Sequence, residues 1–79
     1  MPKRTDLEII AEILANCKQP RPKTHVMYMT NLSWQMVSKY LARLQILGFL
    51  GVHHSKTKYA TTEKGLEFLN RWNSLIELL

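Results

Sequence analysis

Residues 24–50 of the chain, THVMYMTNLSWQMVSKYLARLQILGFL, have the pattern of a short helix, a tight turn and a longer helix that stops at a glycine. We expect the hydroxyl of Thr24 to cap the first helix (24–30) and that of Ser33 to cap the second (33–47), because each can accept a hydrogen bond from an unpaired backbone N–H. Asn31 marks the turn, since asparagine tolerates the left-handed conformation. The pattern predicts a helix-turn-helix, around which the rest of the chain must pack.

The 33–47 helix has two unlike faces. An apolar stripe at helical spacing consists of Val37, Tyr40, Leu41, Leu44 and Leu47. The opposite face is polar or cationic, contains no acid, and consists of Gln35, Ser38, Lys39 and Arg43. A helix that is buried on one side and presents such residues on the other is suited to the major groove of DNA. We therefore interpret it as the recognition helix of a protein that binds double-stranded DNA.

The distribution of charge supports this interpretation. The formal net charge is +5, and all six acids lie at or before Glu12 or at or after Glu63. The charged residues between them are all cations: Lys18, Arg21, Lys23, Lys39, Arg43, Lys56 and Lys58. Such a segment produces a positive field that attracts polyanions. A solvated basic face is common as well, so charge alone does not decide the function.

The flanking segments complete one small domain over 1–79, of mainly α (α+β) class. Thr5 and Glu8 form a capping box that starts a helix over 5–17. Two prolines make 18–23 a basic loop. Strand-forming residues on both sides of a polar tip predict a two-stranded hairpin, the wing, over 49–61. Thr62 caps a last helix over 62–79.

Metal binding and catalysis are not predicted. The candidate metal ligands are Cys17, His25, His53 and His54. They lack the paired spacing of a zinc site. No catalytic set and no glycine-rich phosphate loop is present, so we expect neither an enzyme nor a cofactor or small-molecule ligand. His53 and His54 are better interpreted as polar wing residues near phosphate.

The location of the protein follows from what the sequence lacks. A single cysteine, Cys17, excludes an intramolecular disulfide and is expected to be a core thiol. No apolar run approaches the roughly 20 residues that span a bilayer, and no apolar core follows the basic N-terminal residues. These features predict a soluble protein of the cytoplasm, associated with the nucleoid and not with a membrane.

Trp34 permits two interpretations. It occupies the first turn of the 33–47 helix, before the core positions begin at Val37. In one interpretation it packs on the preceding helix through Tyr28 or Met29. In the other it lies on the exposed tip and contacts a thymine methyl group or a sugar.

The last helix carries more apolar residues than a domain of this size can cover. Five of them would remain in water: Trp72, Leu75, Ile76, Leu78 and Leu79. Because monomers rarely tolerate so large an apolar patch, we expect a homodimer held by Trp72, Ile76 and Leu79, with Leu75 at the margin. In the alternative, the helix folds back on the 5–17 helix and the chain stays monomeric.

Two segments resemble a known family. LSWQMVSKYLARLQILGFL resembles the recognition segment of winged helix regulators, and KYATTEKGLEFL resembles the end of their wing, where Thr-Glu-Lys-Gly recurs. Together with DLEIIAEIL and KTHVMYMTNLS, they make the chain similar to the ten-kilodalton archaeal winged helix-turn-helix proteins that bind DNA and dimerise through a C-terminal antiparallel coiled coil. The C-terminal helix of that group is usually longer than 62–79.

The resemblance implies a role for particular residues. Its base-facing positions fall on Trp34, Gln35, Ser38 and Lys39, with Arg43 nearer to phosphate. Residues 53–58 would lie at the backbone or in the minor groove. We expect most of the affinity to come from phosphate contacts of Arg21, Lys23, Lys56 or Lys58.

Two functions agree with this mechanism, and a third, from another class, would replace it. A transcriptional regulator is favoured because Gln35 and Ser38 are base-reading types. A DNA-binding architectural protein with weak sequence preference is the second. The third is a protein-interaction winged helix whose basic face docks an acidic partner and that never meets DNA.

Overall fold

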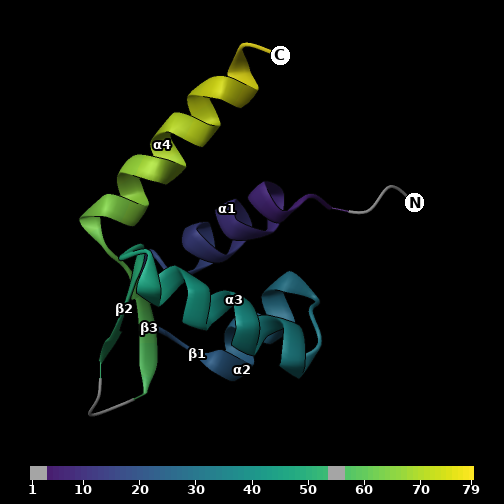
Figure 1. Cartoon of the computed structure of the whole chain (residues 1–79), viewed down its shortest axis with the longest axis vertical. Coiled ribbons are helices and arrows are strands. Elements are labelled where there is room, and N and C mark those ends of the chain that lie inside the picture. Colours follow the sequence, from purple (N-terminus) through teal and green to yellow (C-terminus); the bar gives the residue numbers. More distant parts are fainter. Residues whose placement is uncertain (1–3, 54–56) are drawn as a thin grey trace.

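A computed structural model of the chain describes residues 4–53 and 57–79, and this part contains four helices and three strands (Figure 1). In chain order they are α1 (Asp6–Asn16), β1 (Arg21–Pro22), α2 (Lys23–Thr30), α3 (Trp34–Ile46), β2 (Leu50–His53), β3 (Lys58–Thr61) and α4 (Glu63–Glu77). The expected fold class, a mainly helical winged helix with a helix-turn-helix core, is confirmed.

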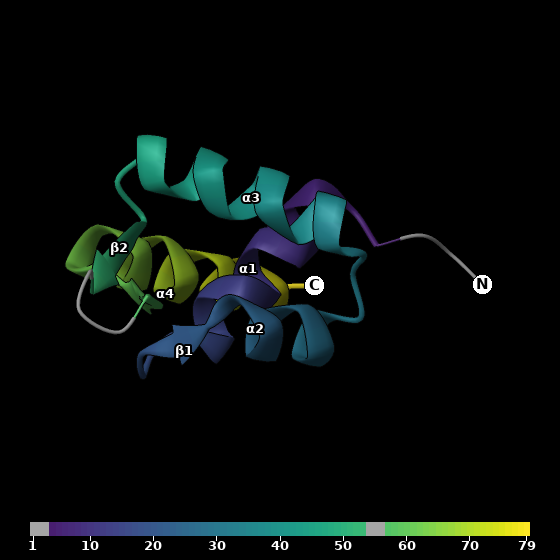
Figure 2. The same ribbon diagram turned by 90° about the horizontal axis from the view of Figure 1, so that it is seen from below.

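The first three helices enclose the core. Figure 2 shows α3 as an outer layer, with α1 beneath it and α2 on the far side. The fully buried side chains come from all three helices, and the largest are Ile13, Leu14, Val26, Val37, Leu41 and Leu44. Leu50 of β2 and Leu69 of α4 close the core from the sheet and from the C-terminal helix. Among the described residues α3 packs along one side only, so its other side is exposed along its length.

Local capping signals were predicted correctly at three helices. The Thr5 and Ser33 hydroxyl oxygens each accept a hydrogen bond of 3.1 Å from a backbone N–H three residues on, and Thr5 forms a complete capping box with Glu8. Thr62 caps α4 in the same way at 3.1 Å. Asn31 ends α2 in the left-handed conformation, with φ of 56°.

The predicted cap of α2 was wrong. The helix starts at Lys23, its N-cap residue is Pro22, and no side chain caps it, so Thr24 lies within the first turn. Pro22 already holds the extended backbone that an N-cap requires, with φ of −71° and ψ of 157°. The ring of proline therefore replaces the hydroxyl as the signal that starts this helix.

The sheet has three strands where the sequence predicted two. The segment 18–23, expected to be a loop, contributes β1, and the strand order is β1-β3-β2, antiparallel throughout. In this register Arg21 lies opposite Tyr59, and Pro22 lies opposite Lys58. β1 is an edge strand, where a proline without an N–H is tolerated. The pairing ties the start of α2 directly to the wing.

Three leucines at or near the helices are exposed, and one of them, Leu47, was expected in an apolar stripe. Leu47 follows the end of α3 and lies at the surface, so the buried stripe of that helix stops at Leu44. Leu7 is half-exposed because it lines a groove between α1 and α4. Leu66 of α4 lies at the surface, and the core is covered by Leu69 with the partly buried Phe68 and Trp72.

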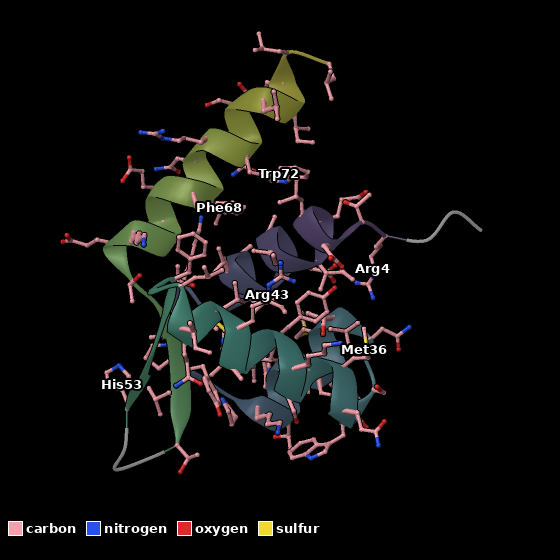
Figure 3. All side chains as sticks on the ribbon, in the orientation of Figure 1. Arg4, Met36, Arg43, His53, Phe68 and Trp72 are labelled. Carbon is pink, nitrogen blue, oxygen red and sulfur yellow. The ribbon has the colours of Figure 1, made fainter. Side chains whose placement is uncertain are left out.

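Only the first half of α4 packs on the domain. Figure 1 shows α4 crossing beside α1 and then running on, so that its C-terminal turns stand away from the other elements. Trp72 points towards α1 (Figure 3) and is partly buried, so the expectation that it would remain in water was too strong.

Candidate nucleic-acid interface

The exposed side of α3 carries a straight row of side chains. Gln35, Lys39, Ala42 and Ile46 recur at i, i+4, i+7 and i+11, which places them on one line of the helix, opposite the buried residues. All four are exposed, and Ile46 retains 87% of its accessible surface. We call these four residues the recognition row. It offers one amide, one ammonium and two apolar groups to whatever lies against α3.

The sequence interpretation identified half of this row. Gln35 and Lys39 were predicted to face the DNA, whereas Ala42 and Ile46 were not, because the prediction considered only polar and cationic residues of this face. The i, i+4, i+7, i+11 spacing was the signal that could have found them. Small and aliphatic groups in this position can contact a thymine methyl group.

Ser38 and Trp34 lie at the flank of the row. The Ser38 hydroxyl donates a 2.7 Å hydrogen bond to the carbonyl oxygen of Trp34, so its proton is already used and only its lone pairs remain for a ligand. The Trp34 side chain is half-exposed, and the Lys23 Nζ lies 4.0 Å from the centroid of its ring. Trp34 is therefore at the surface, where its indole holds a lysine of α2 by a cation–π contact.

The β1–β3 pairing brings the backbone of three predicted phosphate ligands together from distant parts of the sequence, although Arg21 and Lys58 occupy alternate positions and so lie on opposite faces of the sheet. Lys58 lies opposite Pro22, the residue next to Lys23, and Arg21 is one position further along β1. All three cations are half-buried. The remaining wing candidates, His54 and Lys56, lie outside the described residues.

Arg43 is placed apart from these cations. It projects from the edge of α3 towards α1 (Figure 3), where its Nη1 lies 3.9 Å from Oδ2 of Asp6. The other oxygen of Asp6, Oδ1, accepts a 2.6 Å hydrogen bond from the hydroxyl of Tyr40. This hydrogen bond, together with burial, raises the pKa of the Tyr40 hydroxyl. The polar side of α3, free of acids in sequence, thus has a carboxylate beside it in space.

A second surface is formed at the far end of α4. Leu75 and Ile76 are 52% and 46% exposed, and Leu79 is 96% exposed. A groove of about 750 Å³ runs between α1 and α4, and its apolar lining includes Leu7, Trp72, Ile76 and Leu79. Three of the four predicted dimer contacts, Trp72, Ile76 and Leu79, therefore line one groove.

The remaining titratable groups show no other site. Burial raises the pKa of the Cys17 thiol to about 11, against the opposing effect of the Arg21 charge, so the thiol is protonated at neutral pH. Among residues 4–53 and 57–79, no three His, Cys, Asp or Glu side chains are grouped to hold a metal ion. No helix in this part of the chain is long and apolar enough to cross a membrane.

Comparison with models of known protein families assigns this chain to one of them. Residues 3–79 match the model of a winged helix-turn-helix family. The chain belongs to this family. Membership of the winged helix-turn-helix family indicates a non-enzymatic protein, as the sequence predicted.

Two relatives of this winged helix-turn-helix protein are archaeal. An uncharacterized protein of Methanocaldococcus jannaschii, MJ0287, is 36% identical over 78 residues, which cover 98% of this chain and 78% of the relative. The crystal structure of Sso10a-2, a DNA-binding protein from Sulfolobus solfataricus, superposes with a TM-score of 0.84 at 28% identity, over 95% of this chain and 81% of that one. The resemblance to small archaeal winged helix-turn-helix proteins is confirmed.

Proposed function

We propose that this protein binds double-stranded DNA without catalysing a reaction, with α3 in the major groove and the wing against the backbone. The observation that carries the proposal is the recognition row, an exposed, acid-free line of side chains on a helix whose other side is buried. A helix of this kind can enter a major groove, which is about 12 Å wide. The similarity to Sso10a-2, described as a DNA-binding protein, supports the same ligand.

The roles follow from position. Gln35 and Lys39 lie where base edges would be reached, and Trp34 and Ser38 flank them. Lys23 and Lys58 lie close together in the chain path between α2 and the wing, where phosphates would pass, and Arg21 follows on the other face of the sheet. Phosphate contacts supply affinity without sequence information, so specificity would depend on the recognition row.

We propose a transcriptional regulator as the finer function, because an amide at Gln35 can pair with adenine in a bidentate manner. An architectural, nucleoid-associated protein with weak sequence preference is the second candidate. It is favoured by Ala42 and Ile46, which form half of the recognition row and carry no hydrogen-bonding group. The two candidates differ in one measurable ratio, the affinity for a selected site against that for random duplex.

The test is a titration of labelled random-sequence duplex at several salt concentrations. DNA binding predicts a linear fall of log Kobs with log[salt], with a slope of about −0.9 for each phosphate neutralised. Replacing Lys56 and Lys58 together with alanine should flatten that slope by about 2 units per subunit. Absence of duplex binding at low salt would refute the proposal and leave the protein-interaction alternative.

Selection from random duplexes then separates the two finer functions. A regulator should yield a site bound at least ~10³-fold more tightly than random DNA, as specific complexes typically are. A ratio near one would identify the architectural protein.

We also propose that two copies pair through α4, with Trp72, Ile76 and Leu79 at the contact and Leu75 at its margin. The exposure of these apolar side chains and the groove beside them support this pairing. A two-fold dimer would present two copies of α3 to one DNA molecule.

A further inference from the structure

A carboxylate beside the recognition helix is unexpected in a protein that binds a polyanion. Asp6 belongs to α1, yet its two oxygens contact two residues of α3 that lie three positions apart, Tyr40 and Arg43. Together with Met36 and Lys39 these residues line a small pocket of about 150 Å³ at the edge of α3. Asp6 thus introduces the only carboxylate of this pocket.

Asp6 is held in place from two sides. It is the first residue of α1, where the partial positive charge of the helix N-terminus favours an anion. The buried Tyr40 hydroxyl donates to Oδ1 at 2.6 Å, which fixes the orientation of the carboxyl group. Its second oxygen, Oδ2, is therefore presented steadily to the Arg43 side of the pocket.

Arg43 is held only loosely by this pair. Its side chain is 57% exposed, that of Asp6 is 68% exposed, and the separation of 3.9 Å is long for a direct hydrogen bond. Exposed ion pairs of this kind are weak. The pair therefore biases where the guanidinium lies without locking it, and a phosphate would compete with Asp6 for the guanidinium.

We propose that Asp6 is a positioning residue that draws Arg43 towards α1 and so restrains the affinity of the protein for DNA of any sequence. The proposal rests on the proposed DNA-binding function. With Asp6 present, Arg43 contributes less to phosphate neutralisation, and binding depends more on the recognition row. Without the carboxylate, Arg43 becomes an additional, sequence-independent phosphate ligand. Asp6 would then increase discrimination by lowering non-specific binding.

The experiment compares wild type and Asp6→Asn on random-sequence duplex between about 50 and 200 mM salt. Asparagine keeps an oxygen that can accept from Tyr40 but removes the charge that attracts Arg43. One additional phosphate contact should tighten binding about three- to tenfold at low salt and steepen the log–log slope by about 0.9. Because of that slope, the gain should shrink by roughly threefold at the higher salt concentration.

The matched control is Glu63→Gln. Glu63 is the first residue of α4 and follows the N-cap Thr62, as Asp6 is the first residue of α1 and follows the N-cap Thr5. Glu63→Gln therefore removes the same charge from an equivalent helix position. Unlike Asp6, Glu63 forms no salt bridge within 4.0 Å among the described residues. Its affinity and salt slope should match those of wild type.

A double-mutant cycle assigns the effect to Arg43. In an Arg43→Gln background, Asp6→Asn should produce no gain in affinity and no change in slope. Thermal unfolding of each variant shows that the folded protein is being compared.

The outcomes are distinct. If Asp6→Asn leaves both affinity and slope unchanged while wild type binds duplex, or if the gain persists without Arg43, the restraint does not exist although DNA binding stands. Weaker binding by Asp6→Asn would show that the carboxylate assists the complex, for instance by accepting a hydrogen bond from a cytosine amino group, and would also overturn the proposal. If wild type binds no duplex, the proposed function fails instead.

Discussion

Under the proposed function, Gln35 is the residue on which sequence-specific binding would depend most directly, because it is the one amide in the recognition row. If it reads a base edge, Gln35→Ala should cost about 1–3 kcal/mol of binding free energy against a preferred site and much less against random DNA. Affinities on a selected and a random duplex measure this difference. Gln45→Ala removes the same group from an exposed position of α3 outside the row and should change neither value. An equal loss on both duplexes would mean that Gln35 contacts only the backbone.

Cys17 gives a prediction for the pH dependence of stability. Burial raises the pKa of its thiol to about 11 in the folded protein, from an ordinary value of 9.0. Above pH 9 the thiol ionises in the unfolded chain but not in the folded protein, which favours unfolding. The free energy of unfolding therefore falls with rising pH until the folded thiol also ionises near pH 11. The contribution is fully present below pH 9, and its loss approaches about 2–3 kcal/mol at pH 11.

Urea unfolding at pH 8 and pH 10.5 tests this linkage. We expect Cys17→Ala to be less stable than wild type at both pH values. Because it lacks the thiol, its stability should fall less between pH 8 and pH 10.5 than that of wild type. Tyr40, whose pKa is also raised, is present in both proteins, so its contribution cancels in the comparison. Equal pH dependence in the two proteins would show that the thiol is not shielded from water in the folded state.

At the residue scale, the sequence was most informative where the cause is local. Thr5, Ser33 and Thr62 cap helices through groups three residues away, so the pattern itself contains the interaction. Asp6 and Arg43 are 37 positions apart in the numbering and meet only because α1 packs against α3. No local pattern contains that contact.

At the scale of elements, Gly65 explains a recurring motif in physical terms. It is the glycine of Thr-Glu-Lys-Gly, and a Cβ there would overlap the carbonyl oxygen of Phe49 and come within 2.7 Å of Thr61 Cγ2. Gly65→Ala should therefore lower stability by about 1–3 kcal/mol, since backbone must move to make room. In a domain of this size that corresponds to a fall in Tm of roughly 4–8 °C for each kcal/mol.

Gly51→Ala is the matched control for this prediction. A Cβ at Gly51 would have only ordinary contacts, at 3.8 Å to Thr62 Cγ2 and 4.0 Å to the Ala60 carbonyl oxygen. Its Tm should remain close to that of wild type at the same protein concentration. A Gly65→Ala protein as stable as the control would show that α4 can withdraw from β2 without cost.

The short strand β1 shows why one element was missed. Its two residues include a proline, which counts against a strand, and its partner β3 lies more than thirty positions later. Pairing at an open sheet edge decides its conformation, and that edge exists only after the wing has formed. The hairpin and α4 were predictable because their strand formers and cap are contiguous.

For the whole molecule, the decisive measurement is the state of association. Burying each of Trp72, Ile76 and Leu79 contributes roughly 1.5–3 kcal/mol, so wild type should sediment as a dimer at micromolar concentration. Ile76→Asp should sediment as a monomer, because the interface would bury an unpaired charge. Ser74→Asp places the same charge on another side of α4 and should leave the dimer intact. A monomeric wild type would refute the pairing.

The C-terminus of α1 is completed by a residue from β3. The Leu14 carbonyl accepts from the Thr61 hydroxyl at 2.7 Å, and the Cys17 carbonyl accepts from the Thr61 N–H at 2.8 Å. These two atoms belong to the part of a helix end whose carbonyls lack intrahelical donors, and no basic residue lies in the last turn of α1. While the chain is being synthesised, 47 further residues must follow Leu14 before Thr61 exists, which takes roughly 2–10 s at typical translation rates. During synthesis, the Leu14 and Cys17 carbonyls at the C-terminus of α1 therefore have only water as a hydrogen-bond donor until the wing has emerged.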